Sequence, residues 1–195
     1  MTDITTSDRA GKLLAALSEQ LASRERHYEI VVVGGSALLA LGFVDRPTKD
    51  VDVVALSDAG ALQKADPLPS ELIDARDRVA RDFGLQSNWL NAGPASLMDL
   101  GLPEGFLDRV QTRALGDGLT VHFASRLDQI HFKLYALVDQ GPGKHEQDLR
   151  ALAPTPQELI EAARWARSHD PSEGFRDMLE EALRHLGVED ADLGA

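Results

Sequence analysis

Apolar residues recur with two different periods along this chain, and these periods predict its secondary structure. Residues 7–24 carry leucines three to four positions apart, which indicates an amphipathic helix. Short apolar runs at 29–33, 51–56 and 119–123 are typical of strands. Further helices are expected from their apolar faces, cap residues and breakers at 36–41, 70–83, 125–138, 144–153, 156–168 and 171–186.

The order of these elements predicts an α/β (α+β) fold. A short mixed sheet flanked by helices is expected to form a core in residues 1–125. Residues 126–195 are expected to form a helical C-terminal region that packs on this core. Residues 86–118 contain several turn formers and little periodicity, so an irregular connection is expected there.

Composition limits the kinds of molecule that this protein is expected to bind. The 195 residues are 43% hydrophobic and 27% charged, as in ordinary globular proteins, and include no cysteine. The first twelve residues lack a basic-then-apolar signal pattern, and no apolar run approaches the length of a membrane span, so we expect a cytoplasmic protein with no membrane partner. The net charge of −12 argues against broad electrostatic attachment to nucleic acid or anionic lipid.

Two acidic residues form the most informative pattern in the sequence. Asp50 and Asp52 alternate with valines, so both carboxylates are expected on one face of a strand. Two like charges held this close repel each other unless a proton or a cation is shared between them, and Mg2+ or Mn2+ favours carboxylate oxygens. The alternative is a solvent-facing strand with no ligand.

A glycine turn precedes this acidic strand. Gly34, Gly35 and Ser36 follow the run at 29–33 and open the helix expected at 36–41. Backbone amides at such a turn bind phosphate, although glycine pairs are also common in turns that bind nothing. A phosphate cradle followed by two carboxylates indicates a metal-dependent enzyme that acts on a nucleoside triphosphate.

This ordered pair of motifs resembles the nucleotidyltransferase-fold superfamily. The string from Arg46 to Asp52, the triplet Trp89-Leu90-Asn91 and a late lysine helix followed by Asp148-Leu149 are similar to AbiEii-type bacterial proteins, which include toxins of type IV toxin–antitoxin systems. The resemblance covers about residues 30–152 and implies that the core expected in residues 1–125 is nucleotidyltransferase-like. It implies that Asp50 and Asp52 hold Mg2+ and that Gly34, Gly35, Ser36 and Arg46 contact the nucleotide.

The resemblance also assigns catalytic roles to two later residues, each with an alternative. Lys133 contacts phosphate or lies at the edge of a buried helix face, and Asp148 belongs to the site or is a solvated helix carboxylate. Many relatives carry a third carboxylate on a later strand, where it acts as a base. The strand at 119–123 has none, which leaves His122 or Asp148 as substitutes.

Three functions remain open from the sequence. The first is Mg2+-dependent transfer of a nucleotide to an acceptor hydroxyl, with tRNA as the acceptor and an antitoxin as partner if the toxin resemblance holds. The second is a catalytically silent interaction module that keeps the scaffold, as the missing third carboxylate favours. The third is modification of a cationic small molecule such as an aminoglycoside, which the acidic composition allows.

Overall fold

The computed structural model describes residues 7–194, and it divides the chain into two compact units, Met1–Ala124 and Ser125–Ala195. The packing of the helical region on the core stays a prediction. Part of the N-terminal segment on which the export argument rests lies outside the described residues. None of the helices in residues 7–194 is both long and apolar enough to cross a bilayer.

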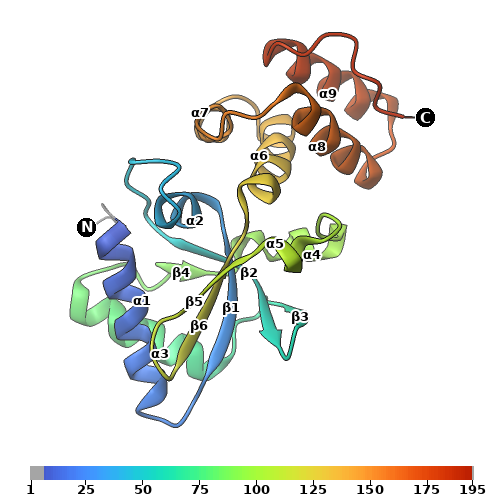
Figure 1. The fold of residues 1–195 in the computed structure, drawn as a ribbon. Helices are drawn as coiled ribbons and strands as arrows, with labels where there is room; N and C mark the ends of the chain where they lie inside the picture. The colour runs from blue at the N-terminus through green and yellow to red at the C-terminus, as the bar shows by residue number, and fades with distance from the viewer. Residues whose placement is uncertain (1–6, 195) are drawn as a thin grey trace. The chain divides into compact units, whose positions relative to one another are not determined.

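Unit 1 is built on a six-stranded mixed sheet (Figure 1). The strand β1 (Tyr28–Val33) lies at its centre, antiparallel to β2 (Val51–Asp58) and parallel to β6 (Leu119–Phe123). Two short strands, β3 (Ala61–Lys64) and β5 (Gln111–Ala114), complete the order β3-β2-β1-β6-β5, and β4 (Leu90–Asn91) pairs with the first residues of β2. The predicted mixed sheet is therefore confirmed.

Two helices cover one face of this sheet. The leucines of α1 (Ser7–Ala22) and the apolar side of α3 (Ser70–Phe83) pack against alternate strand residues such as Ile30, Val32 and Val53. All three of these strand residues are fully buried. Helix α3 ends where predicted because Gly84 adopts the left-handed conformation, with φ of 65°, that closes a helix.

The connection at 86–118 is more ordered than predicted. It contains β4, the 3-10 helix η1 (Gly93–Ser96), the single-turn helices α4 (Leu97–Leu100) and α5 (Phe106–Arg109), and β5. The prediction of a wholly irregular segment is wrong there. Strands β3 and β5 were missed because nearly all their side chains are exposed, so neither shows the apolar alternation of a half-buried strand.

Unit 2 is entirely helical in the described residues. It consists of α6 (Arg126–Gln140), α7 (Lys144–Ala151), α8 (Pro156–His169) and α9 (Glu173–His185). The first three begin close to their predicted positions, and α9 begins two residues later because Ser172 is its N-cap. The ring of Trp165 packs edge-on against Phe132 and Tyr135, with centroids 5.8 and 6.0 Å away, and this joins α8 to α6.

Candidate active site

The glycine turn lies directly against the acidic strand. Helix α2 (Gly34–Ala40) follows β1 without a loop, beginning two residues before the predicted start at Ser36. Gly34 has φ of +72°, a conformation that side chains rarely adopt, and a Cβ atom there would lie 2.7 Å from Oδ2 of Asp52. The positive φ and the close approach of Asp52 both favour glycine at this position. Gly34 therefore allows the Asp52 carboxylate to lie against the backbone.

The loop before the acidic strand folds over the second glycine. A Cβ atom on Gly35 would lie 3.1 Å from Oγ1 of Thr48 and 3.4 Å from Nη2 of Arg46. Thr48 is buried, and its hydroxyl donates a hydrogen bond of 3.3 Å to the Asp50 carbonyl oxygen. The structure thus brings Arg46, Gly34 and Gly35 together with Asp52 in unit 1.

The two carboxylates occupy alternate positions at the start of β2. Val51 and Val53 are fully buried, whereas Asp50 and Asp52 are half-buried. Asp50 directly precedes the strand rather than lying within it, and the Val51 amide donates a hydrogen bond of 2.6 Å to the Trp89 carbonyl oxygen. The alternation places both acids away from the apolar core, where solvent reaches them.

An amide that sequence reasoning did not assign to the site contacts Asp52. Asn91 pairs with Asp52 across β4 and β2, and its Nδ2 donates a hydrogen bond of 3.3 Å to Asp52 Oδ1. The triplet Trp89-Leu90-Asn91 marked the family resemblance. Its role was missed because a two-residue strand has no periodic signal and its register is set by tertiary structure.

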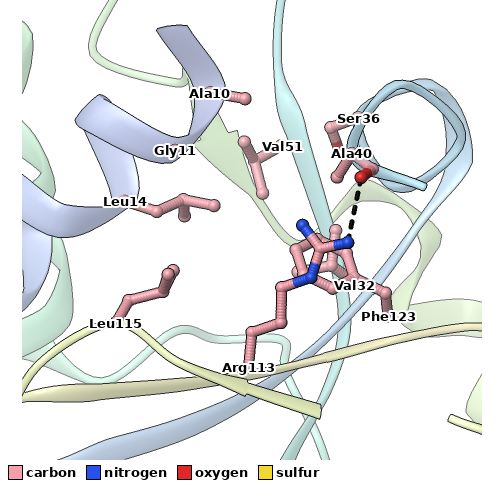
Figure 2. A pocket seen from close by; sticks show the side chains of 10 residues that line it. All are labelled: Ala10, Gly11, Leu14, Val32, Ser36, Ala40, Val51, Arg113, Leu115 and Phe123. Atoms are coloured by element: carbon pink, nitrogen blue, oxygen red, sulfur yellow. Dashed lines mark hydrogen bonds between the residues drawn. The ribbon is translucent and has the colours of Figure 1, made fainter. Parts of the chain in front are cut away.

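Ser36 lies on the core side of the turn. Its side chain is almost completely buried, and its hydroxyl has no hydrogen-bond partner among residues 7–194. Together with Leu14, Val51 and Arg113 it lines a cavity of about 40 Å³. Figure 2 shows these side chains around the cavity. This volume is far below the about 300 Å³ at which ligand pockets begin. The phosphate contact assigned to Ser36 stays a prediction.

His122 lies on a different strand from the acids and is held by other partners. Its Nε2 is 3.0 Å from Glu29 Oε2, and its Nδ1 is 2.8 Å from Thr112 Oγ1. On β1, Val31 pairs with His122 and Val33 pairs with Asp52, on opposite sides. Two strand spacings and two residues therefore separate His122 from Asp52, a Cα distance of about 12 Å. The role of His122 as the base stays a prediction.

Lys133 and Asp148 form an ion pair inside unit 2. The Lys133 Nζ lies 2.8 Å from Asp148 Oδ2, and the two side chains are 6% and 1% exposed. This contact joins α6 to α7. The structure thus brings the two late residues to each other, and their assignment to catalysis stays a prediction.

Residues 7–194 contain no group of three or more histidine, cysteine or acidic side chains that could hold a metal ion. Asp50 and Asp52 still fit Mg2+, because this ion keeps several waters and commonly binds to one or two carboxylates together with substrate phosphates. Their half-buried positions at the start of β2 leave room for such a ligand.

A mixed sheet in which a glycine turn meets an Asp-x-Asp strand defines a protein of the nucleotidyltransferase class. The sequence model of the family DUF6036, nucleotidyltransferases of unknown function, matches residues 12–150, and because this is more than half of the chain, the chain belongs to that family. No curated protein and no solved structure matches the chain. The superfamily resemblance is thereby confirmed, and the AbiEii type stays a prediction.

Proposed function

We propose that this protein transfers a nucleotide from a nucleoside triphosphate to an acceptor hydroxyl and requires Mg2+ or Mn2+ to do so. The observation that carries the proposal is the approach of Asp52 to Gly34, which places a half-buried carboxylate against the first turn of α2. The family membership supports a nucleotide as substrate.

The roles of the residues follow from their positions. Asp50 and Asp52 would hold the cation, and a cation bound there supplies positive charge beside the triphosphate. The backbone amides of Gly34 and Gly35 would contact phosphate oxygens, and Arg46, whose guanidinium reaches Gly35, is placed to add positive charge. Together these five residues would bind and orient the triphosphate.

The transfer itself is a substitution at the α-phosphorus. The acceptor oxygen forms a new bond to phosphorus, the bond to the bridging oxygen breaks, and pyrophosphate leaves with that electron pair. The hydroxyl proton must pass to a base. We retain Asp148 as the proposed base and Lys133 as the proposed phosphate contact, and both roles require that their mutual ion pair opens.

The acceptor is proposed from the resemblance to AbiEii-type toxins. That resemblance favours a tRNA end as acceptor and an antitoxin as partner protein. The net charge of −12 opposes long-range attraction to RNA, so any RNA contact must come from a local cluster of basic residues. An aminoglycoside-like cation suits the acidic composition and is the alternative acceptor.

A catalytically silent module is the second candidate, and one observation favours it. The residue that faces Asp52 from the neighbouring strand is the neutral Asn91, so β4 adds no third carboxylate to the site. Such a protein would bind nucleotide without transferring it.

One experiment separates these functions. Each labelled nucleoside triphosphate is added with Mn2+ or with EDTA, and both binding and incorporation into total tRNA or kanamycin are measured. We expect Mn2+-dependent binding that falls at least about tenfold in Asp52→Ala, because one of the two cation ligands is lost. The matched control is Asp58→Ala, which removes an exposed acid at the far end of the same strand.

The outcomes are distinct. Incorporation into tRNA or kanamycin identifies the acceptor class. Binding that depends on Asp52 without incorporation into either favours the silent module. Binding that is unchanged in Asp52→Ala, or absent from the wild type with all four nucleotides, contradicts the proposed site.

A further inference from the structure

The side chain of Asn91 is held at both ends. Its Oδ1 accepts a hydrogen bond of 2.7 Å from the Gly93 amide, and its Nδ2 donates one of 3.3 Å to Asp52 Oδ1. Because a backbone N–H can only donate, the oxygen of this amide must face Gly93. The nitrogen must therefore face the Asp52 carboxylate.

The strand that carries Asn91 is itself anchored. Trp89 is buried, and its Nε1 donates a hydrogen bond of 3.0 Å to the Arg76 carbonyl oxygen in α3. The Trp89 carbonyl oxygen accepts from the Val51 amide, one residue before Asp52. A group supported in this way can fix the orientation of a neighbouring side chain.

The two oxygens of Asp52 thus have different surroundings. Oδ1 faces the Asn91 amide, and Oδ2 lies 2.7 Å from the position that a Cβ atom on Gly34 would take. A neutral amide orients the carboxylate without adding charge to a site that already contains two acids. A third acid in the same place would repel Asp52 until a cation was bound.

We propose that Asn91 is a positioning residue that orients Asp52 and keeps the acidic charge of the site low enough for the cation to bind only together with the nucleotide. This inference rests on the proposed function and adds an order of binding to it. With two carboxylates, the site needs the triphosphate oxygens to complete the coordination of the cation. The amide therefore acts through Asp52 and supplies no ligand of its own.

Two substitutions of Asn91 test separate parts of this inference. Asn91→Asp keeps an oxygen for the Gly93 amide and replaces the nitrogen that faces Asp52 with a negatively charged oxygen. Asn91→Ala removes both contacts. The matched control is Asn88→Ala, because Asn88 is an exposed residue of the same type three positions earlier.

Mn2+ binding is measured by electron paramagnetic resonance, with Mn2+ alone and with Mn2+ plus each nucleoside triphosphate, and thermal unfolding is followed in EDTA and in Mn2+. We expect Asn91→Asp to bind Mn2+ alone at least about tenfold more tightly than the wild type, and to melt at lower temperature in EDTA but not in Mn2+. Asn91→Ala is expected to bind Mn2+ with nucleotide about tenfold more weakly. Asn88→Ala should match the wild type.

Wild-type affinity for Mn2+ with nucleotide in folded Asn91→Ala would overturn the positioning role. Unchanged binding of Mn2+ alone in Asn91→Asp would overturn the order of binding. If Asp52→Ala still weakens binding at least about tenfold in these experiments, the proposed function stands and only the inference on Asn91 fails. If the wild type binds no Mn2+ with any nucleotide, both fail together.

Discussion

Asp52 in unit 1 and Asp148 in unit 2 have opposite surroundings. Asp52 is half-buried, accepts a hydrogen bond from a neutral amide and lies against glycine backbone. Asp148 is 1% exposed and lies 2.8 Å from the ammonium of Lys133. The ammonium of Lys133 neutralises the buried charge of Asp148 within the fold. A half-buried carboxylate at the start of a strand can instead bind a ligand from solvent.

This difference raises a testable distinction between residues that stabilise the fold and residues that are open to a ligand. The sequence resemblance assigned Asp50, Asp52, Lys133 and Asp148 to one catalytic set. Their burial divides the set into an accessible pair in unit 1 and an enclosed pair in unit 2. Tryptophan fluorescence can follow the unfolding of each unit separately, because the two tryptophans of the chain, Trp89 and Trp165, lie in different units.

The largest effect on stability is expected from breaking the enclosed pair. Asp148→Ala leaves the Lys133 ammonium buried without its carboxylate partner, which costs about 3–5 kcal/mol of unfolding free energy. Urea unfolding followed by Trp165 fluorescence, in a Trp89→Phe background, measures this loss in unit 2. A loss below about 1 kcal/mol would show that the pair is exposed to solvent in solution.

The control for this experiment also tests the catalytic prediction. Lys133→Met combined with Asp148→Leu replaces both charges with apolar groups, and such replacements are often neutral or stabilising. If the pair only stabilises unit 2, this double variant keeps wild-type affinity for Mn2+ with nucleotide. If Lys133 contacts phosphate, the double variant stays folded and binds nucleotide more weakly.

A second charged contact in unit 2 is expected to control its stability in acid. Arg126 donates two hydrogen bonds to Glu158, of 2.6 and 3.1 Å, and mainly these bonds lower the pKa of Glu158 to about 2. The usual pKa of this group is 4.5. The contribution is therefore fully present above pH 4.5 and is lost as the pH falls towards 2, with a size of about 2 kcal/mol after allowance for partial exposure.

Glu158→Gln tests this contribution without removing the helix cap. Glutamine can still reach back to the Thr155 amide as the glutamate does, so the capping box at the start of α8 is kept. We expect the variant to lose less stability than the wild type between pH 4.5 and 2, as measured by urea unfolding at each pH. Glu161→Gln, an exposed change on the same helix, should retain the wild-type pH profile.

The same comparison explains which elements were predictable from sequence. The helices of unit 2 begin at local signals, such as Thr155 with Glu158, which act within one turn of the chain. The start of α9 was misplaced because Asp170 and Ser172 are both good cap residues. Only Ser172 accepts a bond from within α9, while Asp170 accepts one from the Ser172 amide and closes the preceding turn.

Unit 1 was less predictable because its sheet depends on pairing between distant residues. Gly34 meets Asp52 because β1 and β2 are consecutive strands that pair, joined by α2 and the loop at 41–50. The contact of Asn91 with Asp52, and the separation of His122 from it, depend on strand order and register. No local pattern specifies these, because a strand of the same sequence can pair on either side of its neighbour.

The smallest effects are expected at two glycines of unit 1 with opposite surroundings. Gly11 lies within α1 and lines the cavity of Figure 2, and a Cβ atom there would have no atom within 4 Å. Gly118 precedes β6, and a Cβ atom there would lie 2.2 Å from the Ser18 carbonyl oxygen. We expect Gly118→Ala to cost about 1–3 kcal/mol and Gly11→Ala to add about 0.5–1 kcal/mol.

Urea unfolding followed by Trp89 fluorescence, in a Trp165→Phe background, measures both changes where they occur. Alanine at Gly11 stabilises because it restricts the unfolded chain and favours the helix, whereas at Gly118 it meets backbone that cannot move without displacing α1. A destabilised Gly11→Ala would show that α1 packs more closely than the cavity indicates. The same glycine variants can be followed by Trp165 fluorescence in a Trp89→Phe background. If that unfolding transition shifts in parallel, the two units unfold cooperatively. The contrast between Asp52 and Asp148 then concerns access to solvent rather than independent folding of the units.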